Sequence, residues 1–187
     1  MNKDFVMNHF RHLTKRGKPI DVFDGYVPLT IRDLTYVTVL HSNFRVGWGD
    51  GTTEETSAYK YLHSSYDVNE IKDFPIYKCF MDSPAKELVD GMTLHKAIAN
   101  LSTPSDVNFT HAHPERKVIL YYVNLEWRNT GWHGETHFYD DGLANVEFTS
   151  PFTPGRFIVF DGDIPHCIRP QSHLASNYRF TLALTFD

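Results

Sequence analysis

Three histidines have the spacing of metal ligands. His111 and His113 are two residues apart and stand shortly before an apolar run, and His166 follows another apolar run much later in the chain. Residues i and i+2 of a strand face the same side, so His111 and His113 can point at one centre, and so can His113 and Glu115. His166, from a distant strand, would complete a triangular set that leaves positions open for other molecules. The sequence therefore predicts a metal site.

Two ligand pairs are compatible with the segment 111–115. The pair His113 and Glu115 supplies a carboxylate, and two histidines with one carboxylate and open positions are typical of non-haem Fe(II) oxygenases. The pair His111 and His113 supplies imidazoles alone. Pro114 at the second position of a tight turn would place Glu115 in that turn, where its side chain tends to face solvent. We prefer His111, His113 and His166 as the metal ligands, with Glu115 as the alternative to His111.

A basic residue in an apolar strand suggests an anion site. Arg179 begins a run of Phe, Thr, Leu and Ala that is suited to burial. A buried guanidinium needs an anionic partner, and its planar fork matches a carboxylate with two hydrogen bonds. Tyr121 and Tyr122 lie in another apolar run, and one of them could offer a hydroxyl to the same carboxylate.

The second half of the chain has the pattern of a β protein. Short β-rich runs recur there between Pro, Gly, Asn and Asp residues, at 94–100, 107–113, 118–124, 135–139, 145–149, 156–160, 166–169 and 178–186. Strands at this spacing predict a mostly β fold, in particular a jelly roll or double-stranded β-helix.

The first half of the chain has the pattern of supporting elements. Helical spacing or capping signals predict helices over 3–16, over 31–42 with Thr30 as the cap, from Asp67 onwards, and over 83–91, and short strands are expected at 19–25 and 44–48. We expect the helices to pack on one face of the sheet. The prediction is one domain over 1–187, with a helical support at about 1–92 and a β-barrel core at about 93–187.

Composition excludes several classes of partner. A net charge of −5 argues against non-specific binding to nucleic acid or to an anionic membrane, since both require a basic face. Cys79 and Cys167 form no disulfide framework, and no apolar run approaches the length of a membrane span. We expect a cytoplasmic protein.

Four ordered motifs resemble the Fe(II)/2-oxoglutarate-dependent dioxygenases, specifically their prolyl 4-hydroxylase-like branch. The resemblance covers roughly residues 98–187 and rests on the segments 120–127 (LYYVNLEW), 132–138 (WHGETHF), 154–166 (PGRFIVFDGDIPH) and 178–182 (YRFTL). It implies a double-stranded β-helix that binds Fe(II) and 2-oxoglutarate.

The resemblance assigns roles to individual residues. His166 matches the distal iron ligand, Arg179 the residue that holds the far carboxylate of 2-oxoglutarate, and Tyr122 a tyrosine that assists it. The chain departs from the family pattern at two places. The family has His-x-Asp or His-x-Glu where this chain offers 111–115 (HAHPE), and His133 replaces the first glycine of a Trp-Gly-Gly-Glu-Thr motif.

The implied activity is hydroxylation of a C–H bond, with a peptidyl proline as the family's usual substrate and with release of succinate and CO₂. The segment 47–66, which is Gly-rich, acidic and aromatic, could form a lid over a peptide or small-molecule substrate, or it could be an ordinary surface loop. The missing aspartate favours an alternative of another class, a non-catalytic cupin-like module that binds a metal or a small acid.

Overall fold

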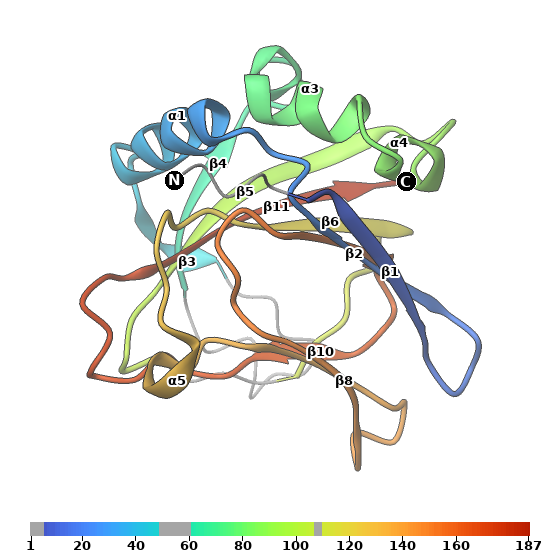
Figure 1. Ribbon diagram of the computed structural model, residues 1–187. Helices are drawn as coiled ribbons and strands as arrows, with labels where there is room; N and C mark the ends of the chain where they lie inside the picture. The colour runs from blue at the N-terminus through green and yellow to red at the C-terminus, as the bar shows by residue number, and fades with distance from the viewer. Residues whose placement is uncertain (1–5, 49–60, 107–109) are drawn as a thin grey trace.

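The computed structural model describes residues 6–48, 61–106 and 110–187, and Figure 1 shows the arrangement of its elements. In chain order these are β1 (Asn8–Leu13), β2 (Pro19–Asp24), α1 (Leu29–Leu40), β3 (Arg45–Trp48), β4 (Tyr61–Tyr66), the 3-10 helix η1 (Ile71–Asp73), α3 (Pro75–Met81), α4 (Ala85–Leu88), β5 (Leu94–Ser102), β6 (Lys117–Tyr122), α5 (Asn129–Trp132), β7 (Thr136–Tyr139), β8 (Val146–Ser150), β9 (Phe157–Asp161), β10 (His166–Ile168) and β11 (Arg179–Phe186).

The fold is mostly β and consists of two antiparallel sheets. The large sheet has the strand order β1-β2-β9-β6-β11-β5-β4-β3, and the small sheet has the order β10-β7-β8. An isolated bridge between His111 and His166 attaches the segment before β6 to the edge of the small sheet. The two sheets face each other, with β10 and β8 opposite the large sheet in Figure 1.

The sequence of strand β11 is almost continuously apolar because both of its faces are buried. It lies between β5 and β6, and its side chains alternate between two buried environments. Phe180, Leu182 and Leu184 join the core beneath the helices. Arg179 and Thr185, on the opposite face, line a cavity between the sheets. A strand covered on both faces needs few exposed polar residues.

The helices α1, α3 and α4 lie on one face of the large sheet, on the side away from the small sheet (Figure 1). Val39 of α1 and Phe80 of α3 share one buried core with Phe157 of β9 and Leu182 of β11. No helix in the described part of the chain has the length and apolarity needed to cross a bilayer.

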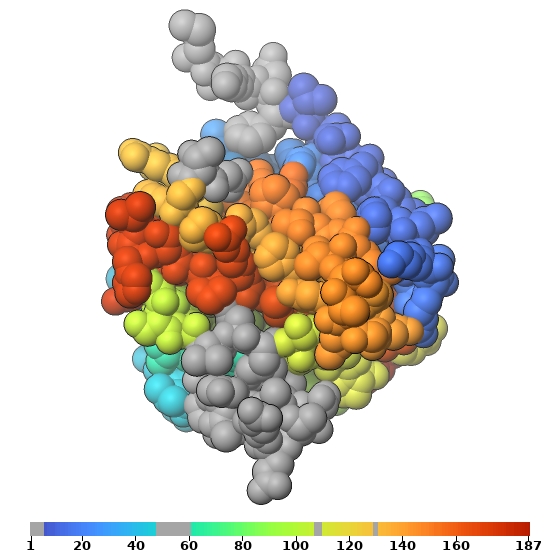
Figure 2. Space-filling model, turned by 90° about the horizontal axis from the view of Figure 1, so that it is seen from below, coloured from blue at the N-terminus to red at the C-terminus, as the bar shows by residue number. Residues whose placement is uncertain are grey.

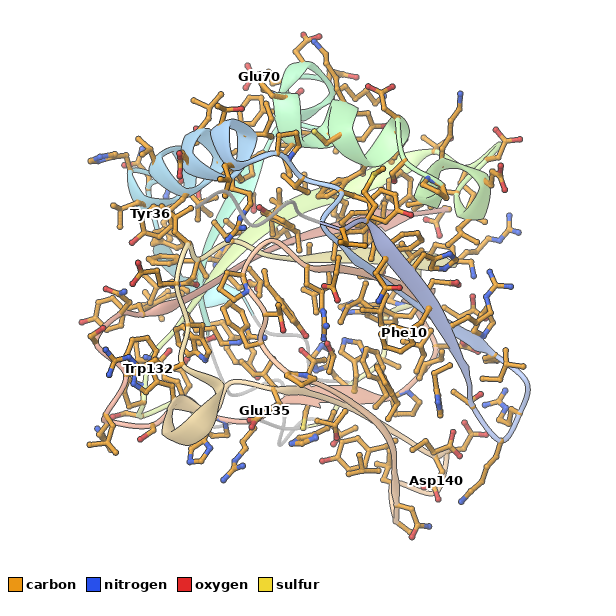
Figure 3. All side chains as sticks on the ribbon, viewed as in Figure 1. Phe10, Tyr36, Glu70, Trp132, Glu135 and Asp140 are labelled. Atoms are coloured by element: carbon orange, nitrogen blue, oxygen red, sulfur yellow. The ribbon has the colours of Figure 1, made fainter. Side chains whose placement is uncertain are left out.

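The helix predicted over 3–16 is wrong, because residues 8–13 form the edge strand β1 paired with β2. His9 and Arg11 face one side, where both hydrogen-bond to the buried carboxylate of Asp21 at 2.7 and 2.8 Å. Phe10, on the opposite side, meets the ring of Phe148 at 5.9 Å (Figure 3). This alternation has a period of two, which the apolar residues alone did not reveal.

The other predictions for the first half have mixed outcomes. The helix over 31–42 is confirmed as α1, but Thr30 is not its cap, because the helix starts at Leu29 after Pro28 without a side-chain cap. The carboxylate of Asp67 accepts the backbone N–H groups of residues 69 and 70, but the turn leads into η1 rather than directly into an α-helix. The helix predicted over 83–91 is confirmed in shorter form as α4.

The predicted strands are confirmed as β2, β3 and β5 to β11, with one exception. The run 107–113 is wrong as a regular strand within its described residues, 110–113, which form only the single bridge at His111; residues 107–109 lie outside the described chain. Most of the proposed lid, residues 49–60, also lies outside it, and residues 61–66 form β4.

Candidate metal centre

His111 and His166 are brought together by backbone pairing. The N–H of His111 donates to the carbonyl of His166 at 3.0 Å, and the N–H of His166 donates to the carbonyl of His111 at 2.9 Å. Residues directly opposite in such a pair have neighbouring side chains. Their ring centroids are 4.5 Å apart.

His113 is held by the turn between β9 and β10. Its N–H donates to the carbonyl of Gly162 at 2.7 Å, and the N–H of Gly162 donates to the carbonyl of Arg116 at 3.1 Å. The approach is so close that a Cβ on Gly162 would stand 1.9 Å from the carbonyl oxygen of Glu115. Only glycine fits here, so this contact fixes where His113 stands relative to His166.

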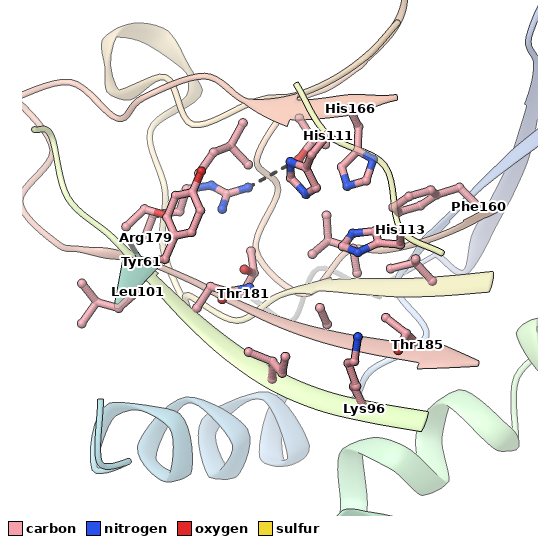
Figure 4. A pocket seen from close by; sticks show the side chains of 18 residues that line it. Tyr61, Lys96, Leu101, His111, His113, Phe160, His166, Arg179, Thr181 and Thr185 are labelled. Carbon is pink, nitrogen blue, oxygen red and sulfur yellow. Dashed lines mark hydrogen bonds between the residues drawn. The ribbon is translucent and has the colours of Figure 1, made fainter. Parts of the chain in front are cut away.

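The three imidazoles form a compact set of nitrogen donors (Figure 4). One ligand atom from each of His111, His113 and His166 lies within 4.8 Å of the others. Nδ1 of His166 is 2.9 Å from the carbonyl oxygen of Ile164, so this nitrogen carries the proton and Nε2 is the available donor. Burial, and then the nearby His111 and His113, lower the pKa of His166 well below its usual value, which favours the neutral form that binds metals.

Glu115 occupies a different position. Its carboxylate is buried, forms an ion pair with the ammonium of Lys96, and is not part of the set of three histidines. Burial acts to raise the pKa of Glu115, but the hydrogen bond from Lys96 and the adjacent backbone keep it below its usual value. Glu115 stays a predicted alternative to His111 as a metal ligand, and its carboxylate forms an ion pair with Lys96 in this structure.

Arg179 is a buried cation with neutral partners. It is 1% exposed, its Nε donates to the carbonyl of Gly134 at 2.9 Å, and its guanidinium lies over the ring of Phe152 at 4.7 Å. Among the described residues, no carboxylate lies within ion-pair distance of it. Desolvation lowers the pKa of Arg179 to about 10, so an anion in the cavity would gain from meeting it.

Asn124 positions Arg179 through the backbone. Its side-chain amide accepts the N–H of Phe180 and donates to the carbonyl of Tyr178, both at 2.8 Å. Because Asn124 is itself 1% exposed, this two-point contact holds the start of β11 rigidly. Gln171 adds a third bond by accepting the N–H of Arg179 at 2.8 Å.

Tyr122 lies behind the cavity wall rather than in it. Its hydroxyl donates to Oγ1 of Thr136 at 2.8 Å, and a guanidinium N–H of Arg179 points at the same oxygen at 3.4 Å. A hydroxyl has one proton and two lone pairs, so Thr136 is left with its proton to donate towards the cavity. The assisting role assigned to Tyr122 stays a prediction, with Thr136 as the group through which it would act.

The cavity has a volume of about 100 Å³, well above the roughly 10–15 Å³ that one water molecule needs. It runs between Arg179 and the three histidines and continues to Lys96 and Thr185 (Figure 4). Lys96 and Thr185 are lining residues that the sequence did not single out. The alternation of β5 and β11 was the signal that could have identified them, since every second residue from Arg179 faces the cavity.

Trp127, Trp132 and Glu135 belong to the motifs quoted from the sequence but do not line the cavity. Nε1 of Trp127 donates to the carbonyl of His133 at 2.7 Å, and its ring packs edge-on against Trp132 at 5.2 Å. Oε1 of Glu135, the residue before β7, lies 3.7 Å from Nη1 of Arg169, and its charge acts to raise the pKa of Arg179. The outer face of the small sheet is visible in Figure 2, where the orange β7–β8 hairpin lies between the blue β1–β2 hairpin and the red segment that follows β10.

His133 has a backbone conformation that favours glycine, with φ 58° and ψ −146°. Gly134 follows with φ +88°, and a Cβ there would stand 3.2 Å from Cδ of Arg179. The pair makes a sharp bend that lets the backbone carbonyl of Gly134 reach Arg179. The bend gives a physical reason for the Gly-Gly of the motif that the sequence resembles, of which this chain has only the second glycine.

Comparisons with solved structures show the fold. The chain is similar to a Pseudomonas putida prolyl-4-hydroxylase, with a TM-score of 0.64 and 16% identity over 97% of this chain and 92% of the other. It is also similar to a Trichoplax adhaerens prolyl hydroxylase in complex with a peptide fragment of the hypoxia inducible factor oxygen degradation domain (TM-score 0.58, 15% identity, 89% and 82% covered).

A third similar structure is SnoN, a non-heme alpha ketoglutarate dependent epimerase from nogalamycin biosynthesis (TM-score 0.63, 10% identity, 91% and 79% covered). No protein-family model and no curated protein matches the sequence. At these identities the likeness shows a shared fold, which in this chain is mostly β with two antiparallel sheets.

Proposed function

We propose that this chain is an Fe(II)- and 2-oxoglutarate-dependent dioxygenase that hydroxylates a C–H bond. The observation that carries the proposal is the buried guanidinium of Arg179, which faces a cavity with three clustered histidines and has no carboxylate partner among the described residues. A dicarboxylate that binds a metal at one end and Arg179 at the other would satisfy both features.

Each group of the site has a place in this proposal. His111, His113 and His166 would hold Fe(II), since imidazole nitrogens suit this metal. Arg179 and the hydroxyl of Thr136 would bind the far carboxylate of 2-oxoglutarate. When bound, the iron and 2-oxoglutarate supply the oxidation, in which O₂ takes two electrons from 2-oxoglutarate, released as succinate and CO₂, and two from the substrate C–H bond, which becomes C–OH.

The chain itself orients these groups and excludes water. The bond from His166 to the Ile164 carbonyl fixes the ring, and the Asn124 contact fixes the Arg179 backbone. Apolar side chains of β5, β6, β9 and β11 line much of the cavity, so charges meet there with little competition from solvent.

The two sheets are proposed to be the double-stranded β-helix of a single domain over 1–187. The N-terminal part, about 1–92, supports the barrel with the helices and also extends its large sheet through β1 to β4. A cytoplasmic location, without nucleic-acid or membrane partners, fits the net charge of −5 and the free thiols of Cys79 and Cys167.

A second candidate function is a non-catalytic module that binds a metal and a small acid. The observation in its favour is the ligand set of three neutral imidazoles, with the nearby carboxylate of Glu115 engaged by Lys96. Such a set leaves the charge of the metal at +2, which the two carboxylates of 2-oxoglutarate would neutralise. The loss of the protein carboxylate would change the redox potential of the iron.

The test is anaerobic titration of the metal-free protein with Fe(II) and 2-oxoglutarate, followed by visible absorption. We expect the charge-transfer band of the chelate in the natural protein, its loss in Arg179→Met, and its retention in Arg116→Met, which removes an exposed arginine. Iron binding without the band would contradict the co-substrate assignment.

Turnover then separates the enzyme from the binding module. An oxygenase consumes O₂ and converts 2-oxoglutarate to succinate slowly even without substrate, whereas a binding module leaves both unchanged. A peptide that contains proline is one substrate to add, since a structural neighbour is a prolyl hydroxylase in complex with a peptide fragment.

A further inference from the structure

The cavity has a second polar end that the proposed chemistry does not use. Arg179, Thr181, Ala183 and Thr185 alternate along β11 and all line the cavity. Six residues at about 3.3 Å each separate Arg179 from Thr185 by roughly 20 Å along the strand. The partner of Thr185 on β5 is Lys96, whose side chain rises toward His113 in Figure 4.

Thr185 is a buried hydroxyl without a hydrogen bond. The residue is 5% exposed, and its Oγ1 has no hydrogen-bond partner among the described residues. A buried hydroxyl that lacks a partner costs about 1–3 kcal/mol, so it is rare unless a ligand or water completes it. A valine of the same shape would avoid that cost.

Lys96 presents a positioned ammonium beside Thr185. Its side chain is 33% exposed and forms an ion pair with Glu115, which is buried and held against the Gly162 turn. The ion pair fixes the position of the ammonium, and an ammonium can donate to several acceptors at once. Glu115 is therefore a positioning residue for Lys96.

The space between the two polar ends is apolar. Ile98, Val118, Leu120, Phe160 and Ala183 line it, close to the three histidines. A molecule bound there would place aliphatic C–H groups near a metal held by the three histidines and an acidic group near Lys96.

We propose that Lys96 and Thr185 bind the carboxylate of the substrate, and that the substrate is a small aliphatic carboxylic acid rather than an internal residue of a peptide. The inference rests on the proposed function and gives its substrate class. Arg179 serves the co-substrate and Lys96 the substrate, so each end of the cavity recognises one acid.

The test measures binding instead of turnover. Zn(II)-loaded protein is saturated with 2-oxoglutarate, so that Arg179 is occupied, and titrated calorimetrically with 4-methylpentanoate or with 4-methylpentanamide, which has nearly the same shape without the charge. The variants are Lys96→Met and Thr185→Val, and Lys78→Met removes an exposed lysine on α3 as the matched control.

We expect the natural protein and Lys78→Met to bind the acid at least tenfold more tightly than the amide, and both cavity variants to lose this preference. Equal binding of acid and amide by the natural protein would overturn the proposal, as would a preference that survives in both cavity variants. Tight binding of a capped proline peptide with no binding of the acid would replace the proposal with the peptide class.

Two controls keep the outcomes distinct. If the natural protein fails to bind 2-oxoglutarate in the first titration, the proposed function itself fails. If Lys96→Met disturbs folding by releasing Glu115, Thr185→Val decides alone, because it removes only a hydroxyl without a described partner.

Discussion

At the scale of the residue, His133 carries strain that a glycine would not. Its φ of 58° with ψ of −146° lies where residues with a side chain are rare, and such positions cost about 1–3 kcal/mol. We expect His133→Gly to raise the free energy of unfolding by about 1 kcal/mol, after allowance for the greater freedom of glycine in the unfolded chain. Urea denaturation measures this change in the free energy of unfolding. His137→Gly, in the regular strand β7, should lower stability, and a loss in both variants would contradict the strain.

Gly162 is a second position where one residue controls the site. We expect Gly162→Ala to destabilise the protein by about 1–3 kcal/mol, as overpacking does, and to weaken metal binding, because a Cβ there meets the carbonyl oxygen of Glu115 at 1.9 Å. Thermal unfolding and metal titration measure the two effects. Gly142→Ala is the control, since its nearest contact would be at 3.8 Å, and equal behaviour of the two variants would refute the argument.

The identity of the ligands can also be tested one residue at a time. We expect His111→Ala to lower metal affinity by more than about 100-fold, since even changes around the ligands cost roughly 10- to 100-fold. Glu115→Gln should leave metal affinity nearly unchanged while it releases Lys96. If Glu115→Gln loses the metal and His111→Ala keeps it, the carboxylate of Glu115 is the ligand in place of His111.

The candidate site could be predicted from the sequence where residue chemistry is conspicuous. Three histidines and an arginine beside apolar runs stand out by type, and the structure brings the histidines together. Thr185 does not stand out, since a threonine in a strand is ordinary. Only the fold reveals that the buried hydroxyl of Thr185 has no hydrogen-bond partner among the described residues. Only the fold reveals that Thr136 accepts a hydrogen bond from Tyr122.

At the scale of the element, the edge strand β1 depends on one carboxylate. Asp21 is 1% exposed and accepts hydrogen bonds from His9 and Arg11. We expect Asp21→Ala to lower stability by about 1.5–3 kcal/mol, the range for hydrogen bonds to a charged group, and to expose the amides of β1 to hydrogen exchange. Asp33→Ala, on the exposed side of α1, should change neither measurement. Protection of β1 that persists in Asp21→Ala would contradict this account.

The elements were predictable where local pattern and tertiary pairing agree. Runs bounded by Gly and Pro in the second half became β5 to β11, because strands buried on both faces need continuous apolar sequence. The segment 3–16, which contains β1, was mistaken for a helix, because its apolar residues at 5, 6, 10 and 13 fit a helical spacing. The pairing of β1 with β2 is not a local property. Tertiary contacts override such weak propensities.

At the scale of the whole molecule, the metal and co-substrate should stabilise a fold that exists without them. The buried cores beneath the helices and between the sheets consist of apolar residues and include none of the three histidines. His166 only contacts the second core, through the rings of Phe138 and Phe160. We expect Zn(II) with 2-oxoglutarate, each at 100 times its Kd, to add at least about 2.7 kcal/mol. For a chain of this size that raises Tm by roughly 5–10 °C. A chelator should reverse the shift without unfolding the protein at 25 °C; unfolding on chelation would make the metal structural.

The alternation of β11 ties the chemistry of the chain to its folding. One face of this strand carries Arg179 and Thr185, and the other carries Phe180, Leu182 and Leu184 of the main core. A deletion of one residue within it would exchange the two faces and put the guanidinium among the helices. The strand can therefore change over evolution by substitution on its cavity face, at Thr181, Ala183 or Thr185, but its length is fixed by the alternation of the two faces.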